Sequence, residues 1–294
     1  MTMSGDEVAA RMTKIMRIFI QGQSIAENGS ELVLIDKQLN EIENEYRSVA
    51  FEAASMAIAI SDFESGAGLK LWSEFNKKYG GKHASQIHSG LGWAIAQKGI
   101  SLTDILVNIE PLMQCRVADG CGYYEGIFRQ QSALKNKIIP DAYSKYTEGF
   151  DQGIGRSVYY SAKGAIEKIP GIINEFPETR QADLWRGVAI ACVYVGGCDE
   201  KMLNRIFNLS GKYNKQLQVG AALVSRARHD AESVTPFAQA ACSLWCHMTF
   251  EEVVAITLKT ESTIADTDGA YKRWMNAIIQ ELSPISTGEE KHKA

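Results

Sequence analysis

The chain has 294 residues, which is enough to bury a large core in one or two domains. Its 45% apolar and 22% charged residues are the proportions of an ordinary globular protein, and no stretch reaches the roughly 18 apolar residues that span a bilayer. The net charge of −4 gives no support to nucleic-acid binding, because proteins that bind nucleic acids usually carry a basic face.

The two ends of the chain differ in character from its middle. The N-terminal stretch MTMSGDEVAARMTKIMRIFI lacks the pattern of a secretory signal, since its apolar run is short and contains Arg17. We therefore expect a cytoplasmic protein. The last stretch, TGEEKHKA, is polar, and we expect residues 285–294 to form a disordered tail after a single domain at residues 1–284.

Between these ends, small residues open a series of apolar helical stretches at nearly regular intervals. A first stretch begins at Ala53, and five more begin 30–34 residues apart at Gly90, Gly120, Gly153, Gly187 and Gly220. Glycine inside a helix costs roughly 1 kcal/mol relative to alanine, so its recurrence indicates helices that pack closely on helices. A period near 33 residues is typical of stacked helical hairpins, either tetratricopeptide-like or in a compact α-solenoid.

A second helix follows the small residues in several of these units. Candidate segments lie at residues 101–115, 165–176, 198–211 and 234–247. In the last of them, Thr235 is a candidate N-cap and Pro236 suits the first helical position. Strand signals are sparse, because no long alternation of apolar and polar residues occurs. The sequence therefore predicts an all-α fold of stacked antiparallel helical hairpins.

Polar and aromatic residues recur at two fixed positions around the small residues. Immediately before them come Glu52, Ser89, Asp119, Gln152, Arg186 and Val219, and three residues after them come Met56, Trp93, Tyr123, Arg156, Ile190 and Leu223. Equivalent positions in a regular stack line up along one surface. We therefore expect an aromatic-walled pocket with a few polar groups, the usual composition of a small-molecule site, made from Glu52, Trp93, Asp119, Tyr123, Gln152 and Arg156.

The stretch FDQGIGRSVYY, residues 150–160, contains a G-x-G pattern that also occurs in phosphate-binding loops. Such loops place their glycines between a strand and a helix, whereas the flanks here are helical and the Walker lysine is absent. We interpret these glycines as packing residues. Asp151 suits either a helix N-cap or a catalytic acid, and Arg156 suits either a structural ion pair or the stabilisation of an anion.

Three further residues also have two interpretations each. Asp119 suits an N-cap as well as a catalytic acid. His88 has a side chain that titrates near neutral pH and suits a proton shuttle, but also a capping or packing role. Glu125 lies among aromatic residues, where burial would raise its pKa and make it a general acid, but a solvated helix face explains it equally well.

The six cysteines do not have the spacing of a zinc ribbon or finger. Cys242, Cys246 and His247 form an alternative metal site, but buried thiols that pack as small hydrophobes are the favoured interpretation. We expect no metal, no cofactor and, in a reducing cytoplasm, no disulfide.

Several long stretches together resemble a bacterial family described as a domain of unknown function and named after an enediyne-biosynthesis protein. The resemblance covers about residues 12–280 and is carried by RSVAFEAASMAIAISD, HSGLGWAIAQ, DGCGYYEGIFR, FDQGIGRSVYY, DLWRGVAIACVYVGG and LQVGAALVSRARH. It implies an accessory or tailoring protein of a natural-product gene cluster, that is, of secondary metabolism.

The resemblance also carries a set of polar residues to this chain, namely Glu52, His88, Asp119, Glu125, Asp151, Gln152, Arg156, Arg180 and Arg226. The chain departs from the family pattern at Tyr124, where the family tends to have histidine, and at Tyr159 and Tyr160, where it tends to have Trp-Phe. Tyr124 argues against a histidine mechanism at that position and leaves a carboxylic-acid mechanism open.

Two functions of different classes follow. The first is a cofactor-independent tailoring enzyme that cyclises, isomerises or eliminates from an apolar polyketide- or terpenoid-like intermediate by acid initiation. Its catalytic candidates are Asp119, Glu125, Asp151 and Arg156, and its substrate-binding candidates are Glu52, His88, Trp93, Tyr123, Tyr124, Gln152 and Tyr160. The second is a helical-repeat binding module without catalysis, for a biosynthetic partner protein or a carrier-bound intermediate.

Overall fold

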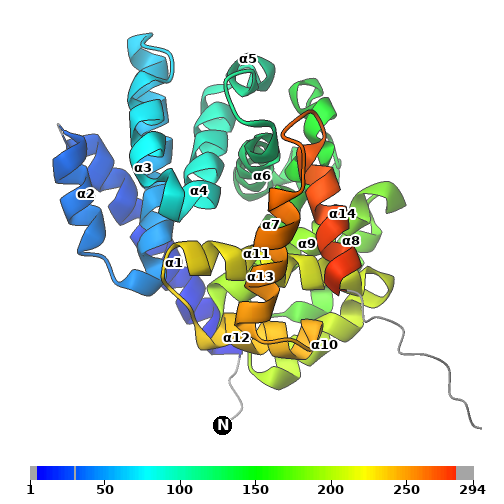
Figure 1. Cartoon of the computed structure of the whole chain (residues 1–294). Coiled ribbons are helices and arrows are strands. Elements are labelled where there is room, and N and C mark those ends of the chain that lie inside the picture. The colour runs from blue at the N-terminus through cyan, green and yellow to red at the C-terminus, as the bar shows by residue number, and fades with distance from the viewer. Residues whose placement is uncertain (1–4, 30, 283–294) are drawn as a thin grey trace, which may run out of the picture.

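The computed structural model describes residues 5–29 and 31–282, and Figure 1 shows its course. Within these ranges the regular structure consists of fourteen α-helices with short 3₁₀ and π turns, and it contains no strand. The all-α prediction is therefore confirmed. Among the described helices, none is sufficiently long and apolar to cross a membrane. The predicted tail at 285–294 lies outside the described residues.

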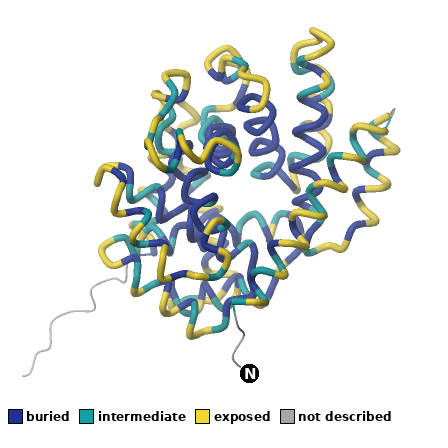
Figure 2. Tube along the Cα trace, turned by 180° about the vertical axis from the view of Figure 1, so that it is seen from behind, coloured by how far each residue is buried: buried dark blue, intermediate teal, exposed yellow. Residues whose placement is uncertain are grey.

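Seven long helices form a curved row in which each packs on the next. They are α1 (Gly5–Asn28), α3 (Asn44–Ser65), α4 (Lys70–Lys98), α6 (Pro111–Phe128), α7 (Thr147–Ala162), α9 (Glu178–Val195) and α11 (Asn214–Asp230). The row curls back on itself, because α11 also contacts α4, and α1 also contacts α9. Figure 2 shows buried backbone on the inside of this arrangement and exposed backbone at its periphery.

Shorter helices connect the row or cover it. They are α2 (Leu32–Asn40), α5 (Leu102–Leu106), α8 (Ile169–Asn174), α10 (Glu200–Ser210), α12 (Pro236–Ala241), α13 (Phe250–Ser262) and α14 (Ala270–Leu282). Helices α13 and α14 cross in front of the row in Figure 1 and pack on α11, and α14 also contacts α6. The connecting segments differ so much in length and kind that a regular period near 33 residues is not confirmed.

Neighbouring helix backbones touch at several glycines of the row, namely Gly90, Gly92, Gly120, Gly122, Gly153, Gly155 and Gly187. A Cβ atom at Gly122 would lie 2.0 Å from the carbonyl oxygen of Phe150, and one at Gly153 would lie 2.0 Å from the carbonyl oxygen of Asp119. Such distances leave no room for a side chain on either residue, so α6 and α7 approach as closely as two helices can. This packing explains why helices that carry glycine in their interiors are stable here despite its low helix propensity.

Two local features bear on the sites described below. Helix α4 is kinked at His83, whose φ of −131° and ψ of 26° lie outside the helical region. The N-terminal half of α4 therefore leaves the row at an angle and faces a different part of the molecule from its C-terminal half. Helix α12 begins as predicted, because Thr235 Oγ1 accepts the backbone N–H of Ala238 at 3.2 Å and Pro236 is the first helical residue.

Candidate functional site

A chain of hydrogen bonds runs through the inside of the curl and joins seven of the described helices. Ser89 Oγ donates to Glu52 Oε1 at 2.6 Å, and Arg156 Nη1 donates to Ser89 Oγ at 3.1 Å and to Asp119 Oδ1 at 2.5 Å. Gln152 Nε2 then donates to Asp119 Oδ2. The residues that precede the small residue in α3, α4, α6 and α7 are thus connected, as their common position in the sequence predicts.

The same chain continues from Gln152 into α9 and α14. Gln152 Oε1 accepts from Arg186 Nε and from the hydroxyl of Tyr271, both at 2.7 Å. Arg186 also pairs with Asp183 and donates to Gln216 Oε1 at 2.9 Å. Polar groups that are buried are stable when their hydrogen bonds are made, and this chain supplies them across helices far apart in sequence.

Arg156 and Glu52 form the charged centre of this chain. Arg156 Nη2 lies 3.4 Å from Glu52 Oε1, and the guanidinium carbon lies 4.2 Å from the centroid of the Tyr123 ring. Burial opposes the charge on Arg156, but Asp119 and Glu52 hold its pKa above the ordinary value. Burial raises the pKa of Glu52, although Arg156 and Ser89 oppose that rise. A larger share of Glu52 is therefore protonated near neutral pH than in an exposed glutamate.

An aromatic pocket of about 480 Å³ lies against this centre. Glu52, Arg156 and Tyr160 form its polar end, while α1, α3, α4 and α6 supply apolar and aromatic walls. The Trp93 ring stands nearly perpendicular to that of Tyr123, with centroids 5.1 Å apart, and also contacts Tyr124. The other residues that line it are Ile15, Met16, Phe19, Ile20, Gln23, Val49, Met56, Gln97, Ile127, Phe128 and Tyr194.

A buried polar atom of a residue that lines the aromatic pocket, the indole nitrogen of Trp93, lacks a hydrogen-bond partner within the described residues. Buried polar groups nearly always have partners, so this atom marks a place where a bound molecule can supply one. Trp93 can only donate, which calls for an acceptor such as a carbonyl or ether oxygen on that molecule.

A small cavity of about 40 Å³ shares Glu52, Arg156, Tyr160 and Tyr194 with the aromatic pocket. Arg116 also lines it, with only 7% of its surface exposed. The guanidinium carbon of Arg116 lies 5.7 Å from the centroid of the Tyr271 ring, and no hydrogen bond or ion pair links this side chain to another described residue. Positive charge is therefore available behind the acid at the polar end of the pocket.

The structure brings together eight of the eleven candidate site residues. Glu52, Trp93, Tyr123, Tyr124, Arg156 and Tyr160 line the aromatic pocket, and Asp119 and Gln152 lie behind it in the hydrogen-bond chain. The three that lie elsewhere are Glu125, Asp151 and His88. The N-cap alternative for Asp119 and Asp151 is wrong, because both residues lie in the interior of their helices.

The three remaining candidates belong to other surroundings. Glu125 projects from another face of α6 than Asp119 and pairs with Arg129 at 2.5 Å. Asp151 accepts from Arg180 Nε at 2.9 and 3.0 Å and from Arg180 Nη2 at 2.5 Å, and burial raises its pKa to about 6 against the effect of that arginine. His88 lines a separate pocket, which is described below.

Several residues of the pocket and of the hydrogen-bond chain were not predicted as site residues, among them Ser89, Arg116, Arg186, Tyr194 and Tyr271. Ser89 and Arg186 occupy the same position immediately before a small residue as Glu52 and Asp119. Selection of that position in every unit would therefore have included both. Tyr271 comes from α14, outside the series of small residues, and no sequence signal connects it with Gln152.

The arrangement combines an apolar, aromatic binding volume with one protonatable acid at its polar end. Glu52 Oε1 accepts the bonds from Ser89 and Arg156, whereas Oε2 has no hydrogen bond to another described residue. An acid of raised pKa with one free oxygen can donate a proton to a bound molecule and take one back. Among the described residues, no three or more His, Cys, Asp or Glu side chains are grouped to hold a metal ion.

Comparison with known proteins identifies the family and no individual relative. No curated protein and no solved structure matches the chain significantly. The family described as "Protein of unknown function (DUF1702)" matches residues 2–282, which include every residue of the aromatic pocket and of the hydrogen-bond chain. The chain therefore belongs to the DUF1702 family.

Proposed function

We propose that the protein is a cofactor-independent tailoring enzyme of natural-product biosynthesis that isomerises or cyclises an apolar polyketide- or terpenoid-like molecule. The observation that carries this proposal is the position of Glu52, a buried acid with one free oxygen at the polar end of an aromatic pocket. We assign the proton to Glu52 rather than to Asp119, because both oxygens of Asp119 are hydrogen-bonded, to Arg156 and Gln152. Glu125 lies on another face of α6.

The reaction needs only proton transfer. The O–H bond of Glu52 breaks as its proton bonds to one carbon of a double bond, whose π electrons form the new C–H bond and leave a cation on the neighbouring carbon. Glu52, now a carboxylate, removes a proton from an adjacent C–H, and those electrons form the shifted double bond. Cyclisation adds one step, in which a second double bond attacks the cation before the proton is lost. Both routes regenerate the acid.

The walls of the pocket suit such a cation. Faces of Trp and Tyr rings attract positive charge through their quadrupoles, and Trp93, Tyr123 and Tyr160 surround the space beside Glu52. Arg156 stabilises the carboxylate form of Glu52 while the cation exists, because it lies 3.4 Å from that side chain. The apolar walls exclude the water that would otherwise capture the cation.

Deuterium exchange tests this function. A native mass spectrum of the purified protein would identify a retained molecule, which would then be incubated with the protein in D₂O; without one, a panel of polyenes and terpenoid alkenes would be used. Because the Glu52 proton exchanges with solvent, we expect deuterium in the product. Glu52→Gln should lower the rate by roughly 10²–10⁴-fold while the molecule still binds.

Asp104→Asn is a suitable control for this experiment, because Asp104 is an exposed acid on α5 and does not line the aromatic pocket. The wild-type rate should fall as pH rises through the raised pKa of Glu52, because the acid form is the active one. Equal deuterium incorporation by wild type and Glu52→Gln would contradict the assignment of the acid.

The exposed rim of the pocket favours a second candidate function, in which the protein holds an apolar molecule without changing it. Met16, Ile20 and Phe128 line the pocket and are 63%, 59% and 61% exposed, so they form an apolar entrance. Such an entrance suits delivery of the molecule by a partner or carrier protein. Binding that survives in both wild type and Glu52→Gln without any deuterium in the ligand would favour this function.

A further inference from the structure

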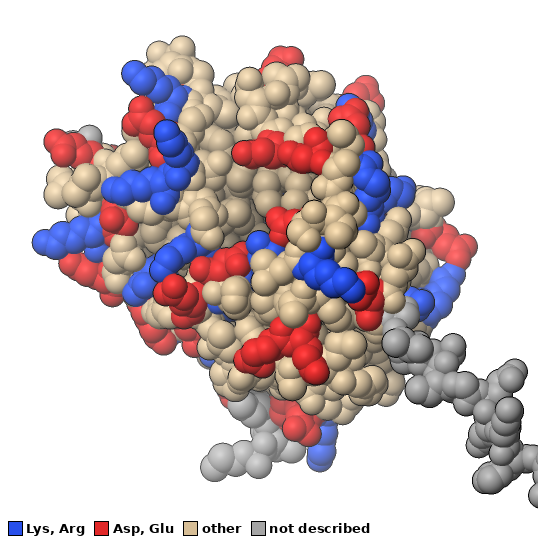
Figure 3. All heavy atoms as spheres, in the orientation of Figure 1, with Lys and Arg blue, Asp and Glu red and all other residues tan. Residues whose placement is uncertain are grey.

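A second pocket, of about 460 Å³, lies between the N-terminal half of α4, the start of α6 and the connection from α13 to α14. It opens on the face shown in Figure 3, where acidic side chains surround a hollow near the centre. None of its lining residues lines the aromatic pocket, so the two are separate sites. The function proposed above makes no use of it.

His88 brings an unusual group to this pocket. Its side chain is 2% exposed, and Nδ1 lies 2.8 Å from the carbonyl oxygen of Ala84. A carbonyl can only accept, so Nδ1 carries the hydrogen and the lone pair of the neutral ring is on Nε2. Burial lowers the pKa of His88 and so favours that neutral ring. Nε2 has no partner among the described residues, although its ring lines the pocket.

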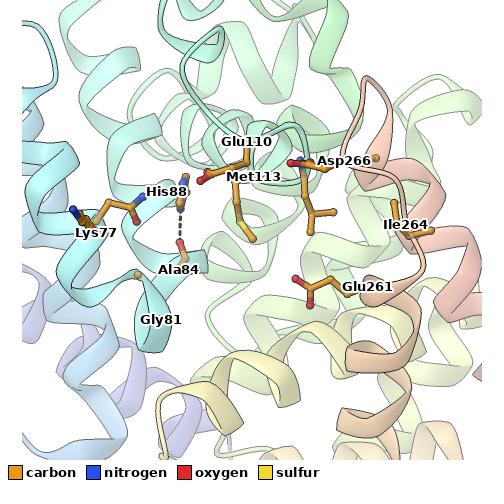
Figure 4. Close-up of a pocket in the computed structure, with 13 residues that line it drawn as sticks. Lys77, Gly81, Ala84, His88, Glu110, Met113, Glu261, Ile264 and Asp266 are labelled. Atoms are coloured by element: carbon orange, nitrogen blue, oxygen red, sulfur yellow. Dashed lines mark hydrogen bonds between the residues drawn. The ribbon is translucent and has the colours of Figure 1, made fainter.

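Acidic residues surround the rest of the pocket. Figure 4 shows Glu110 beside His88, Asp266 farther along the same side, and Glu261 across the opening. Glu110 and Asp266 have no ion-pair partner among the described residues, whereas Glu261 pairs with Arg226. Lys77 is the one lysine or arginine among the described residues that line the pocket, and Figure 4 shows it at the outer edge.

The remaining lining is apolar and open. Leu112, Met113 and Ile264 lie between the acidic residues, and a Cβ atom built on Gly81 would meet nothing within 4 Å. The polar atoms that this pocket offers are mainly acceptors, namely carboxylate oxygens, the Nε2 lone pair of His88 and the buried Oδ1 of Asn76, which also lacks a partner. A molecule that fits must therefore supply N–H donors and positive charge around a short apolar segment.

We propose that this pocket binds an aliphatic diamine, with one ammonium group donating to His88 Nε2 and Glu110, and the other held by Asp266 and Glu261. A bare metal ion fits less well, because no three metal-binding side chains among the described residues are grouped closely enough. The volume and the apolar middle also exceed what an ion requires and suit a chain of several methylene groups.

Three compounds of matched length test the proposal on the full-length protein by isothermal titration calorimetry at one ionic strength. Hexane-1,6-diamine has both charges and N–H donors, hexamethonium has the charges without N–H donors, and hexane-1,6-diol has neither charge. We expect the diamine to bind at least roughly tenfold more tightly than hexamethonium, because a hydrogen bond involving a charged group contributes that much. The diol should not bind measurably.

Variants then assign the effect to the pocket. His88→Phe keeps the ring but removes the acceptor, so it should weaken diamine binding by several-fold while the bonds to the carboxylates remain, and it should leave hexamethonium binding unchanged. Gly81→Leu should fill the open space and abolish binding of both cations. Glu110→Gln keeps an acceptor oxygen but removes the negative charge, so it should weaken diamine binding. It replaces His88→Phe in the experiment if that variant does not fold. Asp104→Asn is the charge-matched control and should change nothing.

Three results would overturn the proposal. They are equal affinities for the diamine and hexamethonium, no binding of the diamine at millimolar concentration, and unchanged diamine affinity in folded His88→Phe. None of these results bears on Glu52 or on the aromatic pocket, so the function proposed above would stand or fall separately.

Discussion

At the scale of single residues, the role of each buried acid depends on how many of its oxygens are bonded. Arg156 and Gln152 occupy both oxygens of Asp119, and Arg180 occupies both oxygens of Asp151. Of these three acids, only Glu52 combines burial, a raised pKa and a free oxygen with a place in the wall of an apolar pocket. Three carboxyl groups of the same chemistry therefore differ in their ability to transfer a proton to a bound molecule, because their hydrogen-bond partners differ.

His83 illustrates the same dependence on surroundings and predicts a pH effect on stability. Its Nδ1 lies 2.9 Å from Ser48 Oγ, its ring stacks on Phe51, and burial lowers its pKa to about 4. The unfolded chain takes up a proton near pH 6.5, whereas the folded one does so only near pH 4, so this contribution to stability is lost as pH falls across that range.

The prediction concerns the difference between wild type and His83→Phe. Between pH 7 and pH 4.5, we expect wild type to lose on the order of 2 kcal/mol more unfolding free energy than the variant. Urea unfolding at the two pH values measures this. The comparison cancels the opposite effect of Asp151, whose raised pKa is present in both proteins. Parallel losses in the two proteins would show that His83 titrates normally.

At the scale of helices, close backbone contact determines the shape of the row. Gly122 of α6 faces the Phe150 carbonyl of α7, and Gly155 of α7 faces the Leu184 carbonyl of α9 in the same way. A Cβ atom on either glycine would lie 2.0 Å from the carbonyl oxygen that it faces. Helix α7 thus contacts α6 through a glycine of α6 and contacts α9 through a glycine of its own. The inner side chains of successive helices come within hydrogen-bonding distance because the backbones do.

A glycine substitution tests this view of the packing. Gly122→Ala should lower the free energy of unfolding by on the order of 3 kcal/mol, because α6 and α7 would have to separate to accommodate the methyl group. Gly171→Ala in α8 is the matched control, since its Cβ would meet nothing within 4 Å and alanine favours the helix. Chemical unfolding measures both, and equal effects would argue against close packing as the reason for Gly122.

At the scale of the whole molecule, the curl of the row encloses polar groups that no single pair of helices could satisfy. Gln152 of α7 bonds Asp119 of α6, Arg186 of α9 and Tyr271 of α14 at once. Helix α14 is not one of the seven helices of the row, but it packs on α6 and α11 and supplies the Tyr271 hydroxyl to Gln152. The chain of hydrogen bonds therefore couples the closing of the row to the polar end of the aromatic pocket.

Removal of one member of this chain should weaken the whole fold. Arg186→Met leaves Asp183 without its ion-pair partner and Gln152 with one bond fewer, and we expect a loss of about 3–5 kcal/mol in unfolding free energy. Arg205→Met removes an exposed ion pair with Glu167 and should change stability little. Thermal and urea unfolding compare the two, and a similar small effect of both would show that the buried chain is not important for stability.

Much of the aromatic pocket could be predicted because its residues repeat at a constant distance from the packing glycines. Trp93, Tyr123 and Arg156 each stand three residues after a small residue, and the close contacts at those residues place all three on the inside of the row. Glu125 is buried and burial raises its pKa, as its aromatic neighbours in the sequence suggested. Helical rotation nevertheless directs it away from Asp119 and from the aromatic pocket.

The sequence by itself determined that the chain is all-α and that glycine-bearing helices pack in series with one polar and aromatic face. These are local properties, since helix propensity and side-chain spacing act over a few residues. Only the tertiary structure decided that the row curls back and that α14 meets Gln152. It also decided that His88 lines a second, acidic pocket with residues from α6 and the α13–α14 connection. Those contacts join segments far apart in the chain, and their geometry depends on the sum of many packing angles that no short pattern contains.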